Sequence, residues 1–239
     1  MSRRDFGVAA ETWSRHRWLN RLQTVLLIVT LLGIAALAGS LLFGDMGLWL
    51  ALAAGGLALL VEPAAGSSLT LRFYRARAVH PSEAPDLWAL VRELAARAGL
   101  PAVPVPHYAP SAMVNAFATG SAHRSAIVLT DGLLRSLTPR ELTGVVAHEV
   151  AHIANEDLRV MGLADSISRL THFMAVLGQV AILFSFPALL LGAVDVNWPA
   201  LLLLAVAPQL ALLAQLGLSR VRAFDAERLA AELTGDPQG

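Results

Sequence analysis

Four long apolar stretches limit what this chain can fold into more than any other feature. They cover residues 22–43, 46–61, 173–194 and 198–218, and none contains Asp, Glu, Lys or Arg. A helix needs about 20 apolar residues to cross the hydrocarbon core of a bilayer. The composition agrees, because 56% of the residues are apolar and 15% are charged, against roughly 25% charged in ordinary globular chains. The sequence predicts four transmembrane helices.

The four stretches form two predicted hairpins, and the charges beside them indicate their orientation. The first hairpin turns near Gly44, and its second helix is rich in Ala and Gly, which allow close packing. Asp45 and Asp195 lie in the turns. The outer ends of the hairpins carry Arg3, Arg4, Arg15, Arg17, Arg21, Arg72, Arg75, Arg77, Arg220 and Arg222. By the positive-inside rule, both termini face the cytoplasm. The alternative is a large soluble core that buries these helices.

The remaining sequence predicts one cytoplasmic domain made of two pieces. We divide the chain into an N-terminal segment with the first hairpin (1–71), a domain segment (72–172), the second hairpin (173–218) and a C-terminal domain segment (219–239). The overall fold class is therefore an α-rich α+β protein with four transmembrane helices. A metal would have to be held by His and carboxylate side chains, because the chain has no Cys.

Within this domain we expect helices and a small antiparallel sheet. Helical spacing of Leu and Val predicts a helix over residues 81–99, and strand-like patterns occur at 107–118 and 125–130. A longer helix is predicted over about 139–169. Its start is marked by a Thr-Pro-Arg-Glu sequence at 138–141, in which Thr and Glu form a capping box around Pro.

The predicted helix over 139–169 contains His-Glu-Val-Ala-His at 148–152. Residues four apart share one face of a helix, so His148 and His152 can point at a single atom. Glu149 is rotated by about 100° and can reach the same point from the side. Two imidazoles and a neighbouring carboxylate are typical of a zinc peptidase, with Glu as the general base. The alternative is a surface helix with two histidines, which the apolar flanks disfavour.

The chain resembles the HtpX family of membrane-bound zinc metallopeptidases, relatives of the CaaX prenyl protease, over nearly its whole length. The resemblance is carried by residues 115–118, 127–134, 138–155 with Asp157, 218–220 and 233–237. It implies a zincin-like cytoplasmic domain and a Zn2+ cofactor. It also implies an endopeptidase of the bacterial inner membrane that takes part in protein quality control. The expected partners are membrane or misfolded proteins and the lipid bilayer, not nucleic acid.

The resemblance also implies roles for individual residues. His148 and His152 correspond to zinc ligands and Glu149 to the general base. Asn115, Ala116 and Phe117 resemble the edge strand that binds substrate by adding it to the sheet; the alternative for this segment is an ordinary core strand. The mechanism implied is hydrolysis of a peptide bond by a metal-activated water.

The sequence departs from the family pattern at the third metal ligand. The family has Glu in a Ser-Arg-x-Arg-Glu-Phe motif, and this chain has Ala223 at that position. Three explanations stand: an inactive or weak member, an engineered change, or replacement by Glu227, four residues later on the same helical face. The alternative for Glu227 is a solvated carboxylate or one that contacts a ligand histidine.

The departure leaves a second function open. An impaired family member would act as a scaffold that binds substrates or partners without cleaving them. The chain ends at Gly239, where relatives continue with further helical sequence. We expect either a short family member or a truncated sequence.

Overall fold

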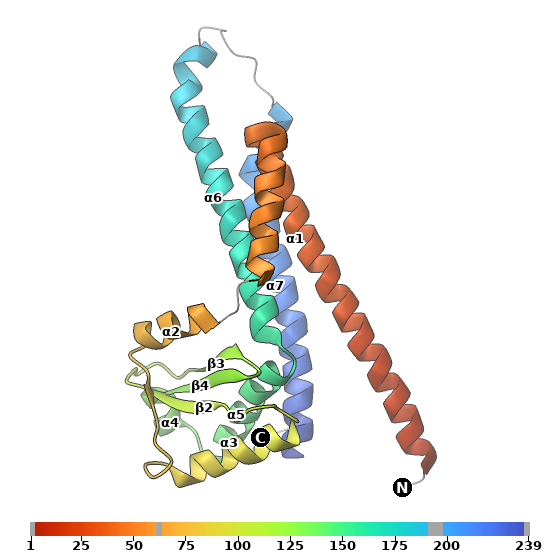
Figure 1. Cartoon of the computed structure of the whole chain (residues 1–239), viewed down its shortest axis with the longest axis vertical. Helices are drawn as coiled ribbons and strands as arrows, with labels where there is room; N and C mark the ends of the chain where they lie inside the picture. The colour runs from red at the N-terminus through yellow and green to blue at the C-terminus, as the bar shows by residue number, and fades with distance from the viewer. Residues whose placement is uncertain (1–2, 61–63, 191–197, 237–239) are drawn as a thin grey trace. The chain divides into compact units, whose positions relative to one another are not determined.

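A computed structural model describes residues 3–60, 64–190 and 198–236 (Figure 1). The chain forms two compact units. The first comprises residues 1–60 and 163–219, and the second comprises residues 61–162 and 220–239. The protein is rich in helix and has one small sheet, which lies in the second unit.

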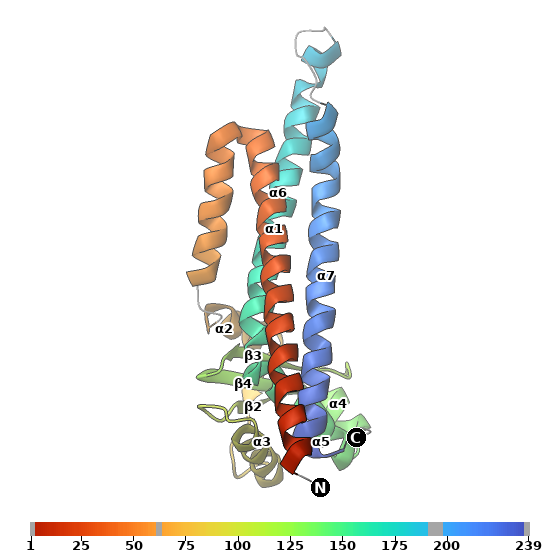
Figure 2. The same cartoon turned by 90° about the vertical axis from the view of Figure 1, so that its right-hand side faces the viewer.

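The first unit consists of long helices. Helix α1 (Arg3–Leu60) contains a sharp turn at Gly44, whose φ of 60° and ψ of −144° are non-helical. After this turn the chain runs back beside the first half of α1 (Figure 2). A Cβ atom on Gly39 would lie 2.5 Å from the carbonyl oxygen of Gly47, so the two halves pack closely through small residues. The first predicted hairpin therefore has a structural counterpart in α1.

Helices α6 (Asp157–Leu190) and α7 (Trp198–Thr234) contribute residues to both units. In the described part of the chain, one stretch, Thr24–Leu41, is long and apolar enough to cross a membrane. Its mean hydropathy is 2.4. The predicted turn of the second hairpin, with Asp195, lies outside the described residues. The four-span topology stays a prediction.

The second unit contains a four-stranded sheet with the order β1-β2-β4-β3. The strands are β1 (Arg77–Ala78), β2 (Val105–Ala109), β3 (Ala116–Ser121) and β4 (Arg124–Thr130). Strands β3 and β4 form an antiparallel hairpin, and β1 pairs with β2 in the same way. Strands β2 and β4 are parallel.

Two sequence-based expectations for this sheet were wrong. The sheet is mixed, not antiparallel, because the β3–β4 hairpin folds back and places β4 next to β2. The single strand predicted over 107–118 is two strands, with a break after Ala109. Pro110 follows that residue and has no N–H to continue the ladder.

The helices of the second unit surround one apolar core. They are α2 (Ala64–Phe73), α3 (Pro85–Arg97), α4 (Asp131–Ser136) and α5 (Pro139–Ala154). Helix α5 contacts α3, β3 and β4. The core consists of Val91, Leu94, Ala118, Ile127, Leu129, Leu133, Val146, Ala147, Val150, Ile153, Ala230 and Leu233. Because the last two belong to α7, the C-terminal segment is part of the fold of this unit.

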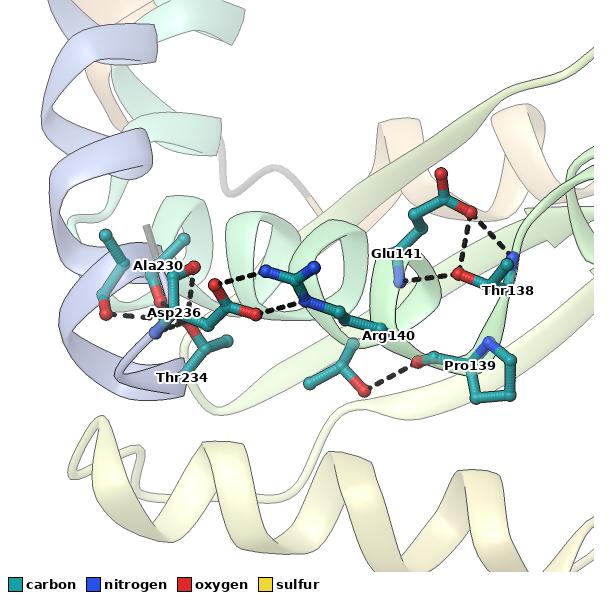
Figure 3. A network of polar contacts seen from close by, with 9 residues as sticks. Thr138, Pro139, Arg140, Glu141, Ala230, Thr234 and Asp236 are labelled. Carbon is teal, nitrogen blue, oxygen red and sulfur yellow. Dashed lines mark hydrogen bonds and ion pairs between the residues drawn. The ribbon is translucent and has the colours of Figure 1, made fainter. Parts of the chain in front are cut away.

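The start of α5 agrees with the sequence-based prediction. Thr138 and Glu141 form the capping box, in which the Thr138 N–H donates to the Glu141 carboxylate at 2.8 Å. Pro139 occupies the first turn (Figure 3). An N–H at this position would have no acceptor within the helix, so its absence in Pro costs no hydrogen bond. This cap fixes where the helix begins, and therefore which face carries each later residue.

The end of α5 differs from the prediction of one helix over 139–169. The helix ends at Ala154, and α6 begins at Asp157. Between them Glu156 adopts a φ of 57°, an uncommon conformation for a residue other than Gly. The break redirects the chain immediately after the His-Glu-Val-Ala-His sequence. It places Asp157, the first residue of α6, in contact with His152.

Candidate active site

His148 and His152 converge as the sequence predicts. Both lie on α5, and their Nε2 atoms are 3.1 Å apart. The ring planes meet at 89°, with centroids 4.6 Å apart. Two imidazole nitrogens at this separation can both reach one ion in a tetrahedral arrangement.

Asp157 contacts the other nitrogen of His152. Its Oδ2 atom lies 2.8 Å from Nδ1 of His152, and its Oδ1 atom accepts a hydrogen bond from Nη1 of Arg222 at 3.0 Å. Asp157 is fully buried and Arg222 is 8% exposed. An ionised carboxylate only accepts hydrogen bonds, so Nδ1 of His152 carries the proton. The other ring nitrogen, Nε2, lies 3.1 Å from Nε2 of His148.

Glu149 lies on the same helix and is 8% exposed. Burial raises the pKa of its carboxyl group. The neighbouring His152 and a hydrogen bond from the Ala118 backbone lower this pKa, but by less than burial raises it. The register of β3 explains that bond. Thr130 donates its backbone N–H to Asn115, so the amides of the alternate residues Ala116 and Ala118 point away from β4.

The electrostatic surroundings of His148 favour the neutral ring. Burial lowers the pKa of its imidazole, and the neighbouring His152 lowers it further. Glu227 and Asp157 oppose this shift by their negative charge. Neutral imidazole is the form that binds a metal ion, so the site keeps His148 ready to serve as a ligand near neutral pH.

The third protein ligand is missing from the described residues. Ala223 lies on α7 and offers no donor atom, and Glu227 is exposed. No cluster of three or more His, Asp or Glu side chains in the described ranges is placed to hold a metal ion. The two imidazoles fit a metal ion, and the buried Asp157 behind His152 is the support that such ligands usually have. The described residues therefore supply two of the three expected donors.

A groove of about 400 Å3 runs beside His148 between α5 and the end of α7. It is lined by Glu141, Gly144, Val145, His148, Glu227, Ala230, Ala231, Thr234 and Asp236. Arg140 binds Asp236 through two contacts of 2.5 and 2.7 Å, which join the start of α5 to the chain just after α7 (Figure 3). The groove brings Glu227 and His148 to one surface.

The predicted substrate segment lies at one edge of the described sheet. Ala116 and Phe117 belong to β3, and Asn115 precedes it. The Asn115 N–H donates to Oγ1 of Thr130 at 3.0 Å, and the Thr130 N–H donates to the Asn115 carbonyl at 3.2 Å. Helices α5 and α2 both contact β3, and the ring of Tyr74, just after α2, lies 4.8 Å from that of Phe117. The segment is therefore joined to α5 through the contact of Ala118 with Glu149.

Sequence reasoning gave no role in the site to two residues that complete this arrangement, Asp157 and Arg222. Asp157 follows His152 by five residues, and Arg222 immediately precedes position 223. Those spacings were the available signals. These spacings alone do not predict the contacts, because the contacts depend on the break after α5 and on the packing of α7.

Comparisons with known proteins identify the protein family of this chain. The sequence profile of peptidase family M48 matches residues 81–239. Together with the histidine pair and the apolar helix, this match supports a membrane-associated metallopeptidase. The comparison with solved structures gave no significant match.

Three curated relatives are each named Protease HtpX homolog. The protein from Acaryochloris marina is 39% identical over 231 residues, which cover 92% of this chain and 75% of the relative. Those from Methylibium petroleiphilum and Gemmatimonas aurantiaca are 35% and 33% identical over 225 residues, covering 92% of this chain and 76% and 77% of the relatives. The chain belongs to peptidase family M48, as an HtpX-like member.

Proposed function

We propose that this chain is a membrane-bound, zinc-dependent endopeptidase that cleaves membrane or misfolded proteins on the cytoplasmic side of the bacterial inner membrane. The observation that carries the proposal is the convergence of His148 and His152 beside the buried Glu149. The named relatives support protease activity. The Arg residues at the outer ends of the apolar stretches support the cytoplasmic orientation.

In this proposal His148 and His152 hold the metal through their Nε2 atoms. Zn2+ suits imidazole and carboxylate donors, and when bound it supplies Lewis-acid chemistry and acidifies a water molecule. Glu149 would accept a proton at its carboxylate and return it to the leaving amine. The raised pKa of the Glu149 carboxyl group suits both roles, because a group that titrates closer to neutral pH both accepts and returns a proton readily.

Substrate binding is assigned to β3. Ala116 turns its amide away from β4, so an extended peptide can pair with this edge, whereas the outward amide of Ala118 is already bonded to Glu149. The contact between Ala118 and Glu149 supports this assignment, because it puts the general base beside the same backbone. Phe117 and Asn115 would hold the strand in place through Tyr74 and Thr130.

The alternative function is a catalytically impaired family member that binds substrates or partners as a scaffold. Ala223 is the observation that favours it, since the third donor is missing. Cleavage of an unstructured protein by the detergent-purified chain with added Zn2+ separates the two functions. The peptidase proposal predicts cleavage that Glu149→Gln abolishes. Substrate binding without any cleavage would support the scaffold.

Glu227 is the proposed replacement for the third ligand. Its charge acts on His148, and both residues line the same groove. Glu227→Gln should then lower zinc content and activity. Glu232→Gln is the matched control, because Glu232 is an exposed carboxylate on the same helix and does not line the groove. Unchanged zinc content and activity in Glu227→Gln would rule out the replacement.

A further inference from the structure

A buried chain of polar contacts links three helices at the candidate site. Arg222 on α7 donates to Asp157 at the start of α6, and Asp157 accepts from His152 on α5. The distances are 3.0 and 2.8 Å, and Asp157 is fully buried. Arg222 and Asp157 are separated by 65 residues in the sequence. Both carboxylate oxygens of Asp157 are therefore engaged.

Burial of this pair needs a reason beyond stability. A buried ion pair seldom stabilises a fold more than apolar side chains of the same volume would, because both charges lose their hydration. The pair between Asp165 and Arg169 offers a contrast: it has the same kind of contact at 2.8 Å but is exposed. What distinguishes the Asp157–Arg222 pair is its contact with a candidate metal ligand.

The break after α5 is what brings Asp157 to His152. In one continuous helix, residues five apart would be rotated by about 140° from each other and would not meet. The chain instead passes through Glu156 with a φ of 57°, a conformation that costs of order 1–3 kcal/mol and persists where the surroundings require it. The local strain is compensated by the contact that it makes possible.

We propose that Asp157 and Arg222 are positioning residues of the metal site. Asp157 keeps the proton of His152 on Nδ1, so that the Nε2 lone pair faces His148 and the metal. Arg222 holds Asp157 in place and fixes the turn of α7 that carries position 223. The effect on metal binding rests on the proposed function. The experiments below therefore test the positioning of His152 and the proposed metal site separately.

The first experiment measures the tautomer of His152 in the metal-free full-length protein. Histidine labelled with 15N is observed by NMR in detergent, and the signals of His152 are identified from their loss in His152→Ala. The proposal predicts that the proton shared with Asp157 resides on Nδ1 of His152. A ring protonated predominantly on Nε2 would overturn it. No variant of Asp157 is needed for this result, so it does not depend on whether such variants fold.

The second experiment measures Zn2+ affinity by competition with a chelator. Asp157→Asn should bind Zn2+ about 10- to 100-fold more weakly than the unmodified chain, and Arg222→Lys, which keeps the charge, should lie between them. Asp165→Asn is the matched control and should leave the affinity unchanged. Circular dichroism and gel filtration establish that each variant is folded. A folded Asp157→Asn variant with unchanged affinity would overturn the proposal.

The two experiments together distinguish the failure of this inference from that of the proposed function. If the unmodified chain binds no Zn2+ but His152 keeps its proton on Nδ1, the zinc peptidase proposal fails and the positioning of His152 stands. If Zn2+ binds and Asp157→Asn changes neither the tautomer nor the affinity, the positioning proposal fails and the metal site stands.

Discussion

The Nε2 atoms of His148 and His152 lie 3.1 Å apart, with the Nδ1 atom of His152 held by a buried carboxylate. The arrangement is the observation on which the proposed metal site rests. Position 223, where the family supplies a further carboxylate, is Ala. Under the proposed function, His148 and His152 would be two of the metal ligands and Glu149 the base, and position 223 would be the changed third ligand.

Restoring the missing carboxylate should strengthen metal binding. The free energy of Zn2+ binding to a complete structural site is about 12 kcal/mol. One of its four ligands therefore accounts for about 3 kcal/mol, which is about 100-fold in affinity. We expect Ala223→Glu to bind Zn2+ about 100-fold more tightly than the unmodified chain and to cleave an unstructured substrate faster. Chelator competition and a cleavage assay on the same preparations measure both effects.

The matched control for this change is Ala223→Gln, which has nearly the same volume and no charge. It should leave both the affinity and the cleavage rate close to those of the unmodified chain. Equal gains from Gln and Glu would show that the added bulk, not the carboxylate, is responsible. No gain from Glu would show that position 223 is not directed at the histidine pair.

Glu149→Gln should separate metal binding from catalysis. The amide cannot accept the proton, so cleavage should be lost while Zn2+ affinity stays the same. Burial raises the pKa of the Glu149 carboxyl group. Its stabilising contribution is therefore present at low pH and is lost as the pH rises through the folded-state value. The metal-free Gln variant should consequently have a higher thermal midpoint than the unmodified protein at pH 7, and a lower midpoint would contradict this reasoning.

The capping box of α5 gives a pH dependence of opposite sign. Hydrogen bonds from the Thr138 backbone and side chain lower the pKa of the Glu141 carboxyl below its ordinary value of 4.5. The carboxylate therefore adds stability above that value, and the contribution is lost as the pH falls through the folded-state pKa. The thermal midpoint of Glu141→Gln should lie below that of the unmodified chain at pH 7 and should match it at low pH. Glu93→Gln, which alters an exposed carboxylate on α3, is the control.

Close packing in α1 predicts a difference between two Gly to Ala changes. A Cβ atom on Gly39 would meet the backbone of Gly47 at 2.5 Å, whereas a Cβ atom on Gly33 would meet nothing within 4 Å. Gly39→Ala should destabilise the protein by about 1–3 kcal/mol because backbone has to move. Gly33→Ala should be neutral or slightly stabilising, since Ala favours helix. Thermal unfolding in detergent compares them, and equal midpoints would refute the packing of this hairpin.

The features that sequence predicted well depend on residues close together in the chain. The capping box spans four residues, from Thr138 to Glu141, and the facing of His148 and His152 follows from a spacing of four in a helix. The turn at Gly44 likewise falls where a glycine follows an apolar run. In each case residues close together in the chain determine the outcome, so the local pattern was sufficient.

The features that sequence missed depend on contacts between distant segments. The parallel pairing of β2 with β4 depends on how the hairpin folds back, which no periodicity reveals. Glu156 carries no signature of a left-handed residue, because its conformation is imposed by the contacts of Asp157. The bond between Asp157 and Arg222 spans 65 residues and could be found only once both helices were placed.

The most direct test of the account is a Zn2+ titration of the purified full-length protein, followed by the metal content after dialysis. The unmodified chain should retain one Zn2+ ion, and a variant combining His148→Ala with His152→Ala should retain none while staying folded. Binding that persists in the double variant, or an unmodified chain that retains no Zn2+, would contradict the central claim that these two histidines form a metal site.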